Sequence, residues 1–112
     1  METTVAALGT VGGVTATITA WPGGGQANAT LITTAINRIT TCATAGDSVK
    51  LPATFVAGQP ITVNNDGATR CNVFPSSGDT ILGLSADVAI QLLPSQSMNF
   101  KAITANSTWS IT

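Results

Sequence analysis

Residues 14–21 read VTATITAW, a stretch in which small or apolar side chains at the even positions alternate with threonines and a tryptophan at the odd positions. A period of two is typical of a half-buried β-strand, and β-branched threonine suits its solvent-exposed face. The sequence PGGG at residues 22–25 ends this strand, because proline and glycine interrupt regular structure. The stretch therefore predicts a β protein whose first strand begins at Val14.

The segments on either side carry weaker signals. Residues 1–13 are small, contain several glycines and lack a pattern, which predicts an extended, flexible N-terminal arm. Between residues 26 and 45, apolar side chains fall at helical spacing, but the many threonines disfavour a helix. We expect a turn or one short helical turn over residues 31–35, followed by a strand over residues 37–43.

From residue 46 onward, short apolar stretches alternate with turn signals, as in sandwiches and barrels. We expect strands at residues 48–51, 59–63, 69–74, 97–104 and 108–111, with brief apolar segments at 81–84 and 88–92. The sequence NNDG at residues 64–67 predicts a tight hairpin with positive φ. The predicted fold is all-β: a single antiparallel β-sandwich or jelly-roll-like barrel over residues 14–112, preceded by a flexible N-terminal arm over residues 1–13.

The composition excludes several classes of protein. Only 8% of the residues are charged, and the formal net charge is −1. Four scattered basic residues do not form the positive surface of a nucleic-acid-binding protein. No stretch approaches the roughly 20 apolar residues of a transmembrane helix, and the first residues, METT, do not resemble a secretory signal. We therefore expect neither a nucleic-acid nor a membrane partner.

The residues that could carry chemistry are few. Histidine is absent, which removes the usual base of a serine nucleophile and a common metal ligand. The candidate acids each lie in or beside a turn, where hydrogen bonds to the backbone explain an aspartate: Asp47, Asp66, Asp79 and Asp87. The glycines at 23–25 lack the Lys-Ser/Thr of a phosphate loop, and residues 64–66 offer calcium one carboxylate. We expect no catalytic residue, no cofactor and no metal site.

The cysteines and tryptophans leave alternatives open. Cys42 and Cys71 could pair, but each lies in an apolar-alternating stretch and the compartment is expected to be reducing, which favours two free, buried thiols. Trp21 shares a predicted strand face with threonines, so it is either an exposed sugar-stacking platform or interface anchor, or part of the core. Trp109, near the C-terminus, is expected mainly to close the core.

Four stretches occur in this order along the chain: DSVKLP at 47–52, GQPITVNNDGA at 58–68, NVFPSSGDTI at 72–81 and NSTWSI at 106–111. This order resembles a small β module of tailed-bacteriophage virion proteins, notably capsid decoration (cement) proteins and fibre-type appendages. With the similar segment upstream, the resemblance covers residues 26–111. The matching positions support a fold rather than an activity, because the family has no catalytic residues to carry over: Pro52, Gly67, Pro75, Gly78 and Trp109.

The resemblance implies a non-enzymatic structural virion protein, made in the bacterial host cytoplasm and often trimeric. Residues 1–20 lie outside the match and carry no coiled coil or shaft repeat, which favours a decoration or cement protein that binds the major capsid protein on the outer capsid surface and stabilises the shell. The alternatives are a head- or tail-fibre module that binds a host-surface glycan, or a generic bacterial sandwich domain. The expected capsid contacts are Val5, Leu8, Val11 and Trp21.

Overall fold

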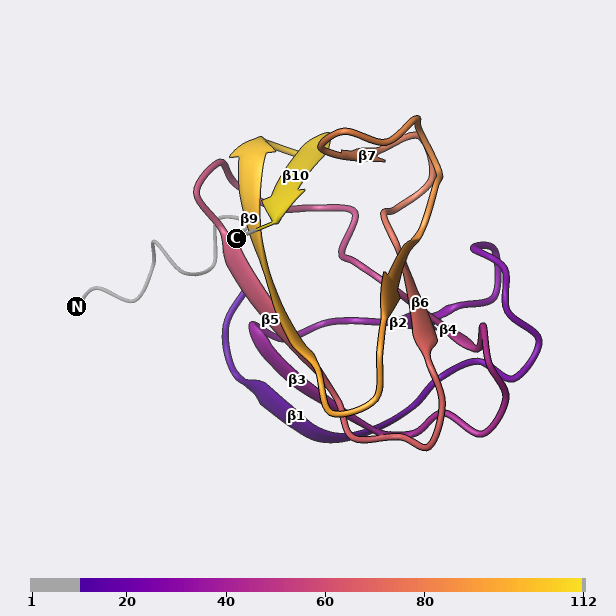
Figure 1. The fold of residues 1–112 in the computed structure, drawn as a ribbon. Helices are drawn as coiled ribbons and strands as arrows, with labels where there is room; N and C mark the ends of the chain where they lie inside the picture. Colours follow the sequence, from indigo (N-terminus) through magenta and orange to yellow (C-terminus); the bar gives the residue numbers. More distant parts are fainter. Residues whose placement is uncertain (1–10, 112) are drawn as a thin grey trace.

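Residues 11–111, the part of the chain that the computed structural model describes, form ten β-strands and no helix (Figure 1). The strands are β1 (Val14–Thr19), β2 (Thr30–Leu31), β3 (Ile36–Thr41), β4 (Ser48–Lys50), β5 (Pro60–Asn65), β6 (Cys71–Phe74), β7 (Thr80–Ile81), β8 (Ile90–Leu92), β9 (Ser97–Thr104) and β10 (Thr108–Ile111). The predicted strands at 97–104 and 108–111 are confirmed with the same bounds.

The strands divide between two sheets. Sheet A has six strands in the order β1-β3-β5-β9-β10-β7, and sheet B has four in the order β2-β4-β6-β8. Through the first six strands the chain alternates between the sheets, so β1, β3 and β5 lie parallel in sheet A, and β2, β4 and β6 lie parallel in sheet B. Paired residues in successive windings lie 19 to 26 residues apart, from Thr30 and Val49 to Ile36 and Thr62, which is similar to the repeat length of solenoid proteins. The arrangement is therefore solenoid-like.

The last strands reverse this direction. β8 lies antiparallel to β6 at one edge of sheet B, and β9 lies antiparallel to β5 in sheet A. β10 then forms a hairpin with β9 and pairs in parallel with the two-residue strand β7. Antiparallel strands thus close the windings on the C-terminal side.

The predicted all-β class is confirmed, but the predicted antiparallel arrangement is wrong for much of the fold. Five of the eight strand pairs are parallel. The loops after β1 to β5 carry the chain to the opposite sheet instead of turning it back beside the strand that it leaves. An alternating pattern fixes which side chains face inward, but it does not specify the partner strand. Over residues 31–35 the chain bends without a helical turn, and the Ile32 N–H donates to the Lys50 carbonyl in the next winding (2.8 Å).

One hydrophobic cluster lies on the inner sides of both sheets. Its largest member is Trp109, which is fully buried and packs against Phe55 with ring centroids 4.1 Å apart, so the expected core role of Trp109 is confirmed. Phe55 comes from the loop between β4 and β5 and is held by Asn106, whose Oδ1 accepts the Phe55 N–H (2.7 Å). The side chain of Asn106 therefore fixes the loop that covers this end of the core.

β1, at one edge of sheet A, does not keep the predicted alternation of inward and outward side chains. Ile18 and Ala20 are buried as expected, but Val14 is 65% exposed and Ala16 is also exposed. The pairing with β3 shifts between Thr15, which lies beside Asn37, and Ile18, which lies beside Ile39. This irregularity inserts an extra residue into β1. Odd-numbered side chains therefore face the core before the irregularity, and even-numbered side chains face it afterwards.

The NNDG segment is not a hairpin, which corrects the prediction for residues 64–67. It connects β5 in sheet A to β6 in sheet B. Asn65 is fully buried: its Nδ2 donates to the carbonyls of Thr69 and Leu92 (2.9 Å each), and its Oδ1 accepts the Gly67 N–H (2.9 Å). Gly67 is needed for a close approach, because a Cβ there would lie 2.7 Å from both Cβ and N of Cys42. The NNDG segment therefore forms a crossing between the two sheets.

The contact between Gly67 and Cys42 yields a stability prediction. Gly67→Ala should destabilise the fold by about 1–3 kcal/mol, because overpacking against backbone forces the crossing to shift. Chemical denaturation measures this. The matched control is Gly12→Ala, since a Cβ at Gly12 meets nothing within 4 Å. Equal stability of the Gly67→Ala variant and the wild type would contradict the proposed role of Gly67.

Candidate interaction surfaces

The outer side of sheet A carries a row of uncharged side chains, two apolar and two polar. Pairing places Val14 beside Ile36, Ile36 beside Thr62, and Thr62 beside Asn99, so the row crosses four strands: β1, β3, β5 and β9. Val14 and Ile36 are 65% and 48% exposed, and the Thr62 hydroxyl donates to Asn99 Oδ1 (2.9 Å). We call this row the sheet A face. It offers β-branched apolar groups next to groups that can form hydrogen bonds.

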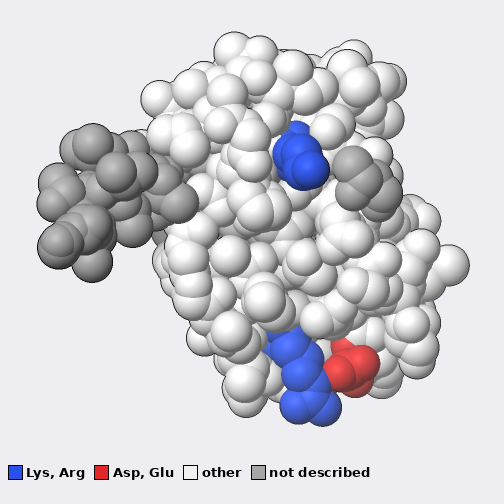
Figure 2. Space-filling model, turned by 90° about the vertical axis from the view of Figure 1, so that its left-hand side faces the viewer, with Lys and Arg blue, Asp and Glu red and all other residues white. Residues whose placement is uncertain are grey.

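Charge is sparse on this side of the molecule. Figure 2 shows the side on which β5 lies in Figure 1, and charged side chains occupy only small parts of it. In the next row, Arg38 donates through Nε to Asp66 Oδ2 (2.6 Å), which neutralises both charges locally. Asp66 is therefore explained by an ion pair rather than by the predicted backbone hydrogen bond of a turn.

β1 forms one edge of sheet A, and within residues 11–111 no strand pairs with its outer side. Its sequence, VTATIT, contains no charged residue and no proline, the residues that commonly protect a sheet edge. The irregular pairing near Thr15 gives the strand some protection, because a bulge makes further pairing less regular. The edge nevertheless offers unpaired backbone groups beside exposed Val14.

The described part of the predicted arm is attached to the sheets. Gln59, which is buried, accepts the Val11 N–H through Oε1 (2.7 Å) and donates from Nε2 to the Val11 carbonyl (2.8 Å). The Gly13 carbonyl accepts the N–H groups of Ala35 and Ile36 (3.1 Å each). Residues 11–13 thus lead from Gln59, directly before β5, to the start of β1.

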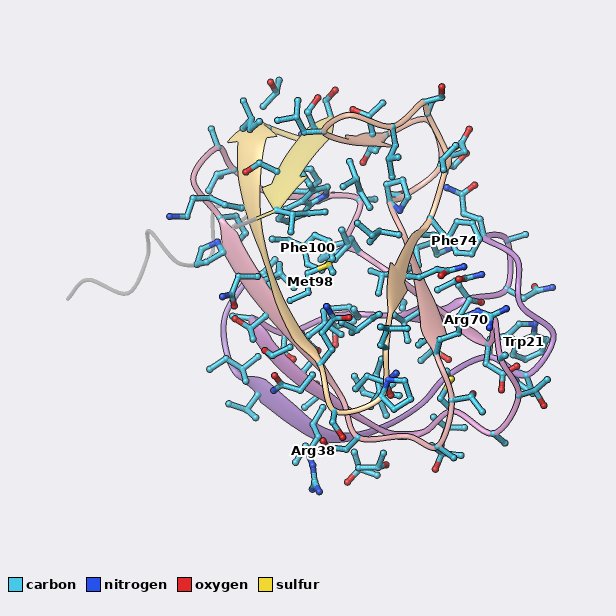
Figure 3. The ribbon with its side chains drawn as sticks, in the orientation of Figure 1. Trp21, Arg38, Arg70, Phe74, Met98 and Phe100 are labelled. Carbon is cyan, nitrogen blue, oxygen red and sulfur yellow. The ribbon has the colours of Figure 1, made fainter. Side chains whose placement is uncertain are left out.

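Of the four predicted contact residues, the two that the structure describes lie on different surfaces. Val5 and Leu8 lie outside the described residues. Val11 is partly buried at the start of β5, whereas Trp21 lies on the opposite side of the molecule (Figures 1 and 3). A single flat partner surface cannot contact both Val11 and Trp21, so the two residues belong to different surfaces.

The outer side of sheet B forms the second surface. Trp21 pairs with Ser48 in an isolated antiparallel bridge, Ser48 pairs with Asn72, and Asn72 pairs with Gln91. Paired residues point to the same side of a sheet, so these four side chains form a row. We call this row the sheet B face. Ser48, between Trp21 and Asn72 in this row, is fully buried, because the loop after Trp21 covers it and its hydroxyl donates to the Gly25 carbonyl (2.8 Å).

The loop over residues 22–28 is fixed at its far end by Gln26. Gln26 donates through Nε2 to the Pro75 carbonyl (2.8 Å) and to Asp87 Oδ1 (3.0 Å). Asp87 Oδ1 also accepts the Gly78 N–H (2.6 Å), and this bond, followed by that of Gln26, lowers the pKa of the Asp87 carboxyl. The predicted local turn role is confirmed for Asp47, whose Oδ2 accepts the Thr44 N–H (3.1 Å), whereas the backbone N–H that Asp87 bonds lies nine residues away.

Asp79 differs from the other acids. Its Oδ2 is buried without a hydrogen-bond partner in the described part of the chain, and it shares this state with Trp109 Nε1. Burial raises the pKa of the Asp79 carboxyl, and the charge of Asp87 raises it further. The ionised form of Asp79 is thus a cost to the folded state.

The two cysteines are free and buried, as the sequence predicted. The Cys42 thiol donates to the Arg70 carbonyl (3.4 Å). Burial, and next the neighbouring Cys42, raise the pKa of the Cys71 thiol well above its usual range. Cys71 therefore stays protonated, which suppresses thiolate reactivity.

Several kinds of site were not found in residues 11–111. These residues enclose no pocket, and they contain no group of three or more acidic, cysteine or histidine side chains that could hold a metal ion. Nor do they include a helix long and apolar enough to cross a bilayer. Comparison of the chain with family models, curated proteins and solved structures found no match.

Asp79 yields a prediction with a defined pH dependence. Asp79→Asn should stabilise the fold at pH 7 by about 1 kcal/mol, because the buried charge is removed. The pKa is raised in the folded state, so the cost of Asp79 is absent below its unfolded pKa and grows as the pH rises through the folded value. The gain seen in thermal unfolding at pH 7 should therefore vanish near pH 3.

Asp87→Asn is the matched comparison for Asp79→Asn. It should lower the melting temperature at pH 7, because the bonds from Gly78 and Gln26 favour the ionised carboxyl. An Asp79→Asn protein that is less stable than the wild type at pH 7 would show that the Asp79 carboxylate has a partner which this account lacks.

Proposed function

We propose that this chain is a non-enzymatic structural protein of a bacteriophage virion, which binds the outer surface of the capsid and stabilises the shell as decoration (cement) proteins do. The resemblance of residues 26–111 to such virion modules supports the class of protein. The observation that carries the proposal is the sheet A face: exposed Val14 and Ile36, nearly without charge, beside the open edge of β1.

The physical properties of this face suit attachment to a large protein shell. Apolar surface contributes about 25 cal/mol for each Å² removed from water, and such a contact is insensitive to salt because it does not depend on charge. An unpaired strand edge can also take up an extended segment of a partner through backbone hydrogen bonds. The major capsid protein is the partner that we propose.

The assembly that we propose is a homotrimer, made in the host cytoplasm and placed on the capsid surface. Three copies around a three-fold axis would multiply contacts that are individually modest, because linked binding events reinforce one another. We also infer that the two sheets form a β-sandwich with mixed strand pairing, in which solenoid-like connections replace most of the predicted antiparallel hairpins. The outer side of sheet A would then be the side that meets the shell.

Co-sedimentation tests this proposal. The purified chain is mixed with capsids assembled from the major capsid protein of the same genome and stripped of accessory proteins, and the bound copies are counted. We expect saturation at a large multiple of the shell symmetry, together with added resistance of the shell to heat and osmotic shock. Absence of saturable binding would contradict the proposal.

A variant pair tests which face binds. Val14→Lys should weaken capsid binding at least about tenfold, because a charge would be buried without a partner in the contact. Gln91→Lys adds the same charge to the sheet B face and should leave binding unchanged. Both positions are exposed, so far-UV spectra should match the wild type. Equal binding of the Val14→Lys and wild-type proteins would remove the sheet A face from the account.

Truncation tests the part of the proposal that concerns Val5 and Leu8. Removing residues 1–10 leaves the bonds between Val11 and Gln59 in place, so the domain should keep its fold. We expect the affinity for capsids to fall, with an unchanged far-UV spectrum. Unchanged affinity would show that Val5 and Leu8 are not contact residues.

A further inference from the structure

Trp21 is an exposed aromatic side chain whose position is fixed. It is 41% exposed, and its backbone makes both hydrogen bonds of a bridge with Ser48: Trp21 N–H to the Ser48 carbonyl (2.8 Å) and Ser48 N–H to the Trp21 carbonyl (3.1 Å). The indole packs over Gly23, where a Cβ would lie 3.0 Å from Nε1. A rigid aromatic side chain loses little conformational freedom when a ligand stacks on it.

Arg70 is exposed and lies directly before Cys71, whose side chain faces the core. Arg70 directly precedes β6, and its carbonyl accepts the N–H of Gly46 (3.1 Å), which lies in the turn before β4. Residues two apart along a strand share a face, which places Arg70 on the same side as Asn72. In the view of Figure 3, the labelled side chains of Trp21 and Arg70 both lie in the right-hand part of the molecule.

The positive charge of Arg70 is available to a ligand. Arg70 is exposed, and among residues 11–111 the ion pair that forms joins Arg38 to Asp66 on the other side of the molecule. Asp47, the acidic residue directly before β4, is buried, and its carboxylate accepts the Thr44 N–H. Lys50 in β4 adds a second cation on the outer side of sheet B, in the row that pairs it with Phe74.

Together these groups match an acidic carbohydrate. The apolar face of a sugar ring stacks on an indole, and the amides of Asn72 and Gln91 both donate and accept hydrogen bonds, as sugar hydroxyls require. A guanidinium binds a carboxylate through two parallel hydrogen bonds. Single-stranded nucleic acid fits less well, because its binding sites combine several stacked aromatics with a continuous basic groove, whereas this face has one tryptophan and two cations.

We propose that the sheet B face is a binding site for acidic glycans, in which a pyranose ring stacks on Trp21 and its carboxylate is held by Arg70. The site goes beyond the proposed function and does not depend on it, because it lies on the side of the molecule away from the sheet A face. On a shell it would face outward, toward the polysaccharides of a bacterial surface.

Titration of Trp21 fluorescence tests the site on the full chain in solution, without capsids. The probes are an oligogalacturonate and an oligosialic acid, with a neutral galacto-oligosaccharide of equal length for comparison. We expect saturable binding of at least one acidic probe, with an affinity at least about tenfold higher than for the neutral one. No saturable binding of either acidic probe would overturn the proposal.

Variants separate stacking from charge. Trp21→Ala, followed by calorimetry because the fluorophore is lost, should reduce the affinity at least about tenfold, and Arg70→Gln should reduce the affinity for the acidic probe to that for the neutral one. Lys101→Gln, which removes one cation from the outer side of sheet A, is the matched control and should change nothing. If Trp21→Ala fails to fold, Trp21→Phe and Arg70→Gln carry the test.

Three results would contradict the site. Equal losses for Lys101→Gln and Arg70→Gln would indicate binding by net charge alone. Unchanged affinity in both Trp21→Phe and Arg70→Gln would place the ligand elsewhere. Tighter binding of single-stranded oligothymidylate than of the acidic glycans, at equal salt, would assign the face to nucleic acid.

Discussion

The chain crosses repeatedly between two sheets, and the fold depends on buried side-chain amides that satisfy the backbone groups at these crossings. Asn65 bonds two carbonyls and one N–H at the crossing from β5 to β6. Gln59 does the same for Val11 before β5, and Asn37 donates to the Thr34 carbonyl (2.8 Å) before β3. A buried backbone group without a partner costs about 1–3 kcal/mol, so a short chain with a modest core needs these residues in place.

This winding determines which surfaces remain for binding. Because the inner sides of both sheets are filled by one core, a partner can contact the two outer sides, the strand edges and the loops, where Leu82, Val88 and Leu93 are exposed. The two outer sides differ chemically: the sheet A face combines exposed Val14 and Ile36 with the polar pair of Thr62 and Asn99, whereas an indole and two amides mark the outer side of sheet B. A protein that is held on a shell by one side and meets its surroundings with the other needs such a division.

Local sequence patterns predicted the last two strands, but they did not predict the parallel windings. The bounds of β9 and β10 follow from alternation and from the turn at Asn106, because their hairpin is decided by neighbouring residues. The parallel windings could not be predicted, since alternation in β1, β3 and β5 does not say which strands pair. NNDG suggested a hairpin because the packing of Gly67 against Cys42 is a long-range contact. The exposure of Trp21 was one of two alternatives, and the position of Arg70 on the outer side of sheet B was missed, because it follows from the tertiary placement of β6.

The central claim is that the sheet A side, and not the Trp21 side, meets the shell. Hydrogen–deuterium exchange of the capsid-bound chain, compared with the free chain, tests it directly. The account predicts slower exchange over residues 14–19 and 36–41 on binding, with unchanged exchange over residues 21–28 and 70–74. Protection confined to residues 21–28 and 70–74 would reverse the orientation, and unchanged exchange throughout residues 11–111 would contradict a contact through either sheet.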